Sequence, residues 1–160
     1  MSGSYSVAMV CLNGHAVNTH ADSRPDRNEK YCSDCGAETI TQCVNCNAPI
    51  RGRYMTPGVI LAGVYTAPSF CYGCGNAYPW TEAKIQAAEE LADEMDKLTP
   101  EEREQLKRSI HDIIRDTPQT PVAATRFKRL VGKAGQKMGE ALWGIVVDIA
   151  SETAKKMIIP

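Results

Sequence analysis

The chain has 160 residues and a formal net charge of −1, with 18 Lys and Arg against 19 Asp and Glu. The residues before Trp80 carry five basic and five acidic side chains, and the rest carry 13 and 14. Neither half is basic overall, which excludes a nucleic-acid-binding protein of generally cationic character. The longest apolar run, residues 141–150, contains Asp148 and is shorter than the roughly 18–20 residues that span a bilayer.

The N-terminal half predicts short strands separated by turns. Residues 5–11 are apolar and β-prone, and they lead into the turn-forming Asn13-Gly14, so we expect a strand, a turn and a returning strand near residues 16–19. Residues 38–43 are β-prone as well. Residues 52–68 mix Gly, Pro and apolar side chains, which predicts a hairpin or two short strands.

Potential metal ligands occur in four short pairs within this half, and they use all seven cysteines and one histidine. The pairs are Cys11 with His15, Cys32 with Cys35, Cys43 with Cys46, and Cys71 with Cys74. Thiolates and imidazoles are the ligands that tetrahedral zinc prefers. A disulfide framework would leave one cysteine unpaired. The N-terminal residues also lack the basic segment and following apolar run that would predict export. We therefore expect two bound Zn²⁺ ions per chain and a reducing, cytoplasmic location.

Two ways of combining the pairs are open. Sequential use gives site 1 from Cys11, His15, Cys32 and Cys35, and site 2 from Cys43, Cys46, Cys71 and Cys74. A cross-brace would join the first pair to the third and the second to the fourth, as RING-type domains do. Those domains place the second and third pairs almost adjacent, whereas seven residues separate Cys35 from Cys43 here. This spacing favours sequential sites, with His20 as a less favoured substitute for His15.

The three Cys-x-x-Cys pairs share a further feature that supports real metal-binding turns. The residue after the second cysteine is Gly36, Asn47 or Gly75. A zinc knuckle turns tightly at this position, where a positive φ is needed and amide N–H groups are expected to face the sulfurs. Gly and Asn reach that conformation at least cost.

From Trp80 onward the sequence predicts helices. The expected spans are about residues 82–98, 100–116 and 121–158, with a possible break near 132–139, where several glycines lie. Thr81 is expected to cap the first helix, and Thr99-Pro100 with Glu102 forms a capping box at the start of the second. The glycines indicate either a bend or a close approach between backbones.

Three features of this half have both structural and functional interpretations. The basic stripe comprises Arg126, Lys128, Arg129, Lys133 and Lys137. Its structural interpretation is a solvated helix face, and its two functional interpretations are a phosphate-binding surface and a membrane-surface contact. Trp80 is expected to cover site 2 and Trp143 to anchor a core or an interface, whereas His111 is expected on the surface. The apolar run 141–150 favours burial against a partner or a second copy.

No catalytic motif is apparent. Both inferred sites have four protein ligands, whereas a catalytic zinc keeps one position open for water or substrate. His15 is not followed by the x-Glu of zinc deaminases, and no P-loop, GxSxG elbow or HExxH helix is present. We therefore expect a protein that is not an enzyme.

Four segments carry a resemblance to a known family. Residues 11–15 (CLNGH), 31–36 (YCSDCG), 43–52 (CVNCNAPIRG) and 71–81 (CYGCGNAYPWT) resemble an uncharacterised bacterial family of zinc-ribbon proteins, classed as a domain of unknown function. The resemblance implies zinc at the eight positions and a bacterial cytoplasmic setting. It implies no activity.

These observations predict a small α+β protein. Residues 1–79 form a tandem zinc-ribbon or treble-clef-like module with short β-hairpins, and residues 80–160 form an all-helical region. The expected function is a non-catalytic protein–protein interaction or adaptor module, with a partner protein or self-association engaged through residues 80–160. The alternatives are nucleic-acid binding through the ribbons and the basic stripe, and peripheral membrane binding through the C-terminal amphipathic helix.

Overall fold

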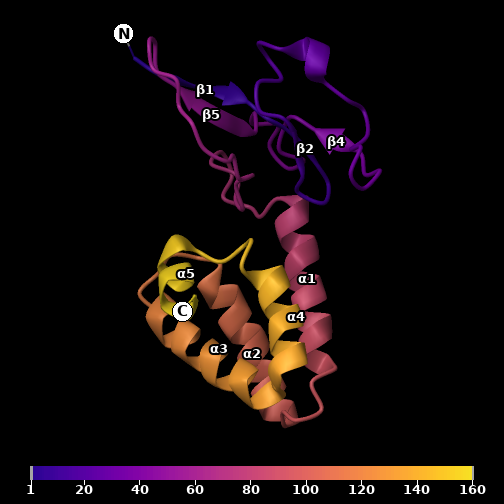
Figure 1. The fold of residues 1–160 in the computed structure, drawn as a ribbon, viewed down its shortest axis with the longest axis vertical. Coiled ribbons are helices and arrows are strands. Elements are labelled where there is room, and N and C mark those ends of the chain that lie inside the picture. Colours follow the sequence, from indigo (N-terminus) through magenta and orange to yellow (C-terminus); the bar gives the residue numbers. More distant parts are fainter. Residues whose placement is uncertain (1, 160) are drawn as a thin grey trace. The chain divides into compact units, whose positions relative to one another are not determined.

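The computed structural model describes residues 2–159 and forms two compact units, one ending at Glu82 and the other beginning at Ala83. The N-terminal unit contains short antiparallel strands, and the helical unit contains the α-helices (Figure 1). The protein is therefore a small α+β protein. The division falls inside the first helix, whereas the sequence predicted a boundary between residues 79 and 80.

Two small sheets organise the N-terminal unit. One pairs β1 (Ser4–Val7) with β5 (Arg51–Met55), and the other orders β3 (Ala16–Asn18), β2 (Met9–Cys11) and β4 (Thr39–Ile40) side by side. The expected strand over residues 5–11 is interrupted at Ala8, whose N–H donates to the Ile50 carbonyl at 2.8 Å. A single turn of 3₁₀ helix, η1 (Pro25–Arg27), lies between β3 and β4.

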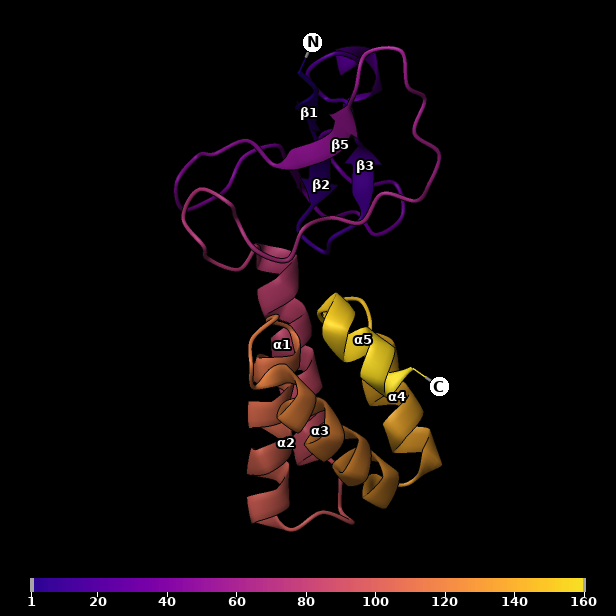
Figure 2. The ribbon, with the colours of Figure 1, turned by 90° about the vertical axis from the view of Figure 1, so that its left-hand side faces the viewer.

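The prediction of a hairpin or two short strands within residues 52–68 is wrong. Only β5 forms there, and it pairs with β1 instead of with a neighbouring segment. Tyr5 lies opposite Tyr54, and their rings meet edge to face at 5.0 Å. Such cross-strand aromatic pairs stabilise a two-stranded sheet. The chain after β5 runs as a loop, visible in magenta in Figure 2.

Five helices are present in the described residues. Their bounds are α1 (Pro79–Asp93), α2 (Pro100–Ile113), α3 (Thr120–Ala134), α4 (Gln136–Val146) and α5 (Glu152–Ile158). In the helical unit α3 packs against α2, α4 and α5 (Figures 1 and 2). Leu106, Ile110, Phe127, Leu130 and Leu142 are almost fully buried in the core between them. No helix in the described part of the chain is long and apolar enough to cross a membrane.

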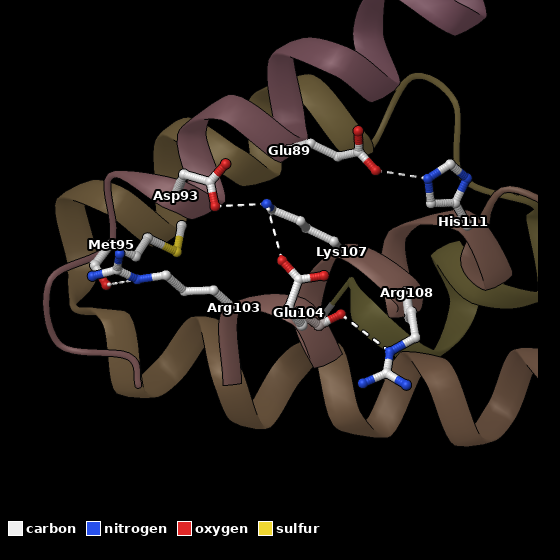
Figure 3. A network of polar contacts seen from close by, with 8 residues as sticks. All are labelled: Glu89, Asp93, Met95, Arg103, Glu104, Lys107, Arg108 and His111. Atoms are coloured by element: carbon white, nitrogen blue, oxygen red, sulfur yellow. Dashed lines mark hydrogen bonds and ion pairs between the residues drawn. The ribbon is translucent and has the colours of Figure 1, made fainter. Parts of the chain in front are cut away.

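A polar network on one side of the helical unit links α1 to α2 (Figure 3). Lys107 Nζ lies 2.6 Å from the Asp93 carboxylate and 3.2 Å from that of Glu104. His111 Nε2 lies 2.7 Å from Glu89 Oε1, so this exposed histidine is paired across the two helices. Asp93, followed by Glu104, raises the pKa of Lys107. These contacts help to orient α1 and α2 relative to each other.

Helix ends differ from the prediction at several points. α1 begins two residues before Thr81, which is buried and donates its hydroxyl to the Ser69 carbonyl at 2.9 Å instead of capping the helix. α1 also ends five residues before the expected residue 98, and α2 ends three before the expected 116. The expected helix 121–158 is three helices, separated at Gly135 and over residues 147–151.

Candidate metal centres

The three Cys-x-x-Cys segments fold into the same turn. In each, the first cysteine N–H donates to the carbonyl five residues later, and the residue after the second cysteine donates back to the first cysteine carbonyl, all at 2.8–2.9 Å. Gly36, Asn47 and Gly75 have φ of +74°, +61° and +75°. The expected positive φ is therefore present three times. The N–H of each of these residues faces a carbonyl, however, and not a sulfur as expected.

The first ligand pair uses a different turn. Gly14, with φ of +91°, donates its N–H to the Cys11 carbonyl at 2.9 Å. This turn brings His15 back beside Cys11, so that His15 Nδ1 lies 3.5 Å from Cys11 Sγ. A second knuckle from residues 32–37 completes the group, with Cys35 Sγ at 3.7 Å from Cys11 Sγ and Cys32 Sγ at 3.7 Å from His15 Nδ1.

The second group consists of two knuckles facing each other. Cys43 Sγ lies 3.8 Å from Cys74 Sγ, and Cys46 Sγ lies 3.6 Å from Cys71 Sγ. The structure thus gathers the eight residues in the sequential combination, in two groups whose ligand atoms all lie within 4.8 Å of one another. Neither group mixes the pairs as a cross-brace would.

The spacing of these atoms fits a tetrahedral metal ion. Metal–sulfur bonds of about 2.3 Å, the length of zinc–thiolate bonds, place two sulfurs of a tetrahedron about 3.8 Å apart. The sulfur–sulfur distances of 3.6, 3.7 and 3.8 Å match this value. The donor atoms, three thiols with an imidazole and four thiols, are those of closed structural sites. Both groups could therefore hold a metal ion.

Neighbouring N–H groups favour the thiolate form of Cys35, which metal binding requires, whereas burial raises the pKa of the Cys11 thiol in the same group. The backbone N–H of Ala37, then the Asn13 side chain, lower the pKa of the Cys35 thiol to about 6. Asn13 Nδ2 lies 3.4 Å from this sulfur, and His15 donates its backbone N–H to Cys11 Sγ at 3.3 Å. These donors come from the ligand-bearing turns themselves.

An aromatic pair packs beside the second group and reaches the first. Tyr78 stacks on Trp80 with ring centroids 4.5 Å apart, and both belong to the cluster that contains Cys43 and Cys71. Trp80 also lies against the first ligand turn, because a Cβ at Gly14 would be 3.0 Å from the Trp80 Cβ. Its indole N–H donates to the Pro68 carbonyl at 3.0 Å. Trp80 thus packs between the two ligand groups, and not over site 2 alone as expected.

Tyr78 is a residue that sequence reasoning missed. Its hydroxyl is buried and has no hydrogen-bond partner within the described part of the chain. Burial, then the Cys71 sulfur, raise the pKa of this phenol, which keeps it neutral. The only sequence signal was its place between the fourth ligand pair and Trp80.

The other candidate residues lie outside both groups. His20 is 3.0 Å from Thr19 Oγ1 and 3.4 Å from Met55 Sδ, away from the ligand atoms. In the basic stripe, Lys133 Nζ lies 2.6 Å from Glu102, and Lys128 Nζ donates to the Met157 carbonyl at 3.4 Å. Trp143 is half-buried, with its ring 6.2 Å from that of Phe127.

Comparison with known proteins identifies one match. The model of a family described as an uncharacterized protein conserved in bacteria (DUF2321) matches residues 4–158, nearly the whole chain. Searches of curated proteins and of solved structures found no match.

Proposed function

This chain belongs to the DUF2321 family of bacterial proteins, whose description names no activity, and we therefore propose its function from its own geometry. We propose that it is a non-catalytic zinc protein that acts as an interaction module. The observation that carries the proposal is the pair of four-ligand groups with tetrahedral spacing. Four protein ligands leave no position for a substrate or water, which favours a structural role for both ions. Soft thiolate ligands in tetrahedral geometry favour zinc over magnesium, calcium or manganese.

Metal analysis tests the zinc sites. We expect two zinc ions per purified chain, and one ion in each of the single variants Cys35→Ser and Cys74→Ser, since these exposed cysteines belong to different groups. Cys35→Ser with Cys74→Ser in one chain should bind neither ion. Iron in place of zinc, or a chain that carries one ion when both groups are intact, contradicts the proposal.

The interaction role is supported by an apolar groove in the helical unit. Its volume is about 560 Å³, and its lining includes Phe127, Val131, Trp143 and Ile158. Gly132 also lines it, and a Cβ at Gly132 meets no atom within 4 Å. We propose that a partner protein or a second copy of the chain places an apolar side chain here. Grooves with aromatic walls are where interface anchors bind.

A matched pair of glycine variants tests the groove. A Gly132→Gln side chain projects into it, whereas Gly144→Gln is equally unobstructed but lies outside the lining residues. We expect Gly132→Gln to reduce the recovery of partner proteins with the tagged full chain from its host, or its self-association by light scattering, and Gly144→Gln to change neither. Equal behaviour of the two variants contradicts this use of the groove.

Nucleic-acid binding through the basic stripe is the second candidate. Arg129 and Lys137 are exposed, which supports phosphate contact, but Lys133 is already paired with Glu102. A gel shift at low salt tests it, because phosphate contacts weaken as salt rises. Absence of a shift at low salt counts against this candidate.

A further inference from the structure

The loop that follows β5 exposes aliphatic side chains that the zinc groups and the helical unit do not account for. We call residues 56–65 the apolar loop. Ile60 is 99 % exposed and Val64 is 96 % exposed, and the neighbouring Val59 and Leu61 are about half exposed. Single exposed apolar residues are ordinary, but a contiguous group on one loop marks an interaction site.

Three hydrogen bonds give the loop a defined shape. The Val59 N–H donates to the Thr56 carbonyl at 3.1 Å, with Pro57 and Gly58 (φ +77°) at the centre of a type II turn. The Arg53 guanidinium donates to the Gly63 carbonyl at 2.6 Å. The Tyr65 hydroxyl donates to the Arg51 carbonyl at 2.6 Å, which fastens the end of the loop to β5. The exposed aliphatic side chains therefore lie on a loop whose conformation is held by hydrogen bonds.

The segment of sequence that contains this loop carries charge of one sign. Residues 39–81 contain Arg51 and Arg53 and no Asp or Glu, although the chain as a whole is slightly acidic. A hollow of about 280 Å³ beside the loop is lined by His20, Arg53, Tyr54, Met55 and Val59–Leu61, again without a carboxylate. Arg51 lies over the rings of Tyr5 and Tyr72, at 4.6 and 3.9 Å from their centroids.

We propose that the apolar loop inserts Ile60 and Val64 into an anionic lipid surface. Insertion removes their aliphatic side chains from water, while Arg51 and Arg53 at the base of the loop face the negatively charged headgroups. Tyr5 and Tyr54 flank the base and supply the amphipathic rings that favour the headgroup level. This inference goes beyond the proposed function. It rests on the proposed zinc sites only because the ligand pairs at residues 43–46 and 71–74 lie on either side of the loop in the sequence.

The shape of the loop favours lipid over a folded protein partner. Protein interfaces bury about 800 Å² on each side and centre on Trp, Tyr or Arg seated in a pocket. Here the most exposed side chains are the aliphatic Ile60 and Val64, which are 99 % and 96 % exposed and are seated in no pocket of their own chain. A lipid surface needs no complementary pocket, only apolar insertion and opposite charge.

Vesicle binding by the full-length zinc-loaded chain tests the proposal. We expect the wild type to sediment with vesicles of equal parts phosphatidylglycerol and phosphatidylcholine, less so with phosphatidylcholine alone, and less at high salt. Ile60→Asp should weaken binding to the anionic vesicles by about tenfold or more, because a carboxylate opposes both insertion and headgroup attraction. Val122→Asp, an equally charged change at a half-exposed residue of α3, should leave binding unchanged.

A gain-of-signal variant guards against misfolding. In Ile60→Trp the indole should retain or strengthen binding, and tryptophan emission should shift to shorter wavelength when anionic vesicles are added. Metal content is measured on every preparation, so failure of the zinc sites is distinguished from failure of lipid binding. The proposal is overturned by a wild type that does not bind anionic vesicles, by Ile60→Asp binding as the wild type does, or by loss of a protein partner as the only effect of Ile60→Asp.

Discussion

Two glycines with positive φ allow the cost of backbone strain in the ligand turns to be compared with the cost of a steric clash. Gly75 ends the last knuckle at φ +75°, and a Cβ there would meet no atom within 4 Å. Gly14 has φ of +91°, and a Cβ there would lie 3.0 Å from the Cβ of Trp80. We expect Gly75→Ala to cost about 1 kcal/mol from backbone strain alone, and Gly14→Ala to cost clearly more. Denaturation of the metal-loaded proteins measures both, and equal costs would contradict the packing role of Trp80.

The buried phenol beside the second ligand group leads to a second prediction. Among residues 2–159 the Tyr78 hydroxyl has no hydrogen-bond partner, so Tyr78→Phe should change the free energy of unfolding by less than about 1 kcal/mol and leave both metal ions bound. Tyr78→Ala removes a ring that stacks on Trp80 and should cost about 3–5 kcal/mol. Urea denaturation with metal analysis distinguishes the two. A large cost for Tyr78→Phe would mean that the hydroxyl binds the Cys71 sulfur once metal is present.

Between neighbouring helices, Glu102 joins the start of α2 to α3. Its carboxylate accepts from the Thr99 N–H at 3.0 Å in the capping box and lies 2.6 Å from Lys133 Nζ. Lys133, then the Thr99 N–H, lower the pKa of Glu102 below its ordinary value. The resulting stability is present above the ordinary carboxyl pKa and is lost as the pH falls through the lowered value.

We therefore expect Glu102→Gln to weaken the dependence of the free energy of unfolding of the helical unit on pH in the acid range. The wild type should be more stable than the variant near neutral pH, and the difference should shrink as Glu102 is protonated. Helical circular dichroism during denaturation at a series of pH values measures it. Val122→Ala, a change at a half-exposed residue of α3, serves as a control because it removes no ionisable group and leaves Glu102 and its partners intact. A pH-independent difference between wild type and Glu102→Gln would contradict the assignment.

The helices also show which features the sequence could predict. The capping box at Thr99 was readable because its residues lie within four positions of one another. The end of α1 was not, because Met95 and Leu98 keep helical spacing and remain buried in the turn that follows Asp93. The break before α5 combines a local cap, in which the Ser151 hydroxyl accepts from the Ala154 N–H at 3.2 Å, with a distant partner, since the Ser151 N–H donates to the Ile113 carbonyl at 2.8 Å.

The glycines of the last predicted helix illustrate the same limit. The sequence left a bend and a close backbone approach as alternatives, and each occurs at a different residue. Gly135 takes a positive φ of +99° and separates α3 from α4. Gly139 is helical, and a Cβ there would lie 2.9 Å from Val131 Cγ1 and 3.4 Å from the Val131 carbonyl oxygen, so the backbone of α4 approaches that of α3. The ligand groups were predictable because their chemistry is local to each pair, whereas Trp80 and Tyr78 acquire their roles from packing.

For the whole molecule, the two units should respond differently to loss of metal. The N-terminal unit has a small core, in which Cys43 and Cys71 are themselves members beside Val10, Ile50 and Trp80. The helical unit has a separate core that contains no ligand residue. Structural zinc contributes on the order of 10 kcal/mol per site in zinc-finger peptides. That is comparable to the whole stability of an ordinary domain, so the N-terminal unit should depend on both ions.

We accordingly expect a chelator to unfold the N-terminal unit while the helices remain folded. Most helical circular dichroism should survive, and limited proteolysis should cut within the first 80 residues and leave a fragment that begins in α1. Acid should have the same selective effect, because protons compete with metal for the thiolates. Restoring zinc should recover the protease resistance of the full chain. Loss of the helical signal in step with metal release would show that the two units unfold as one, and would contradict the independence of their cores.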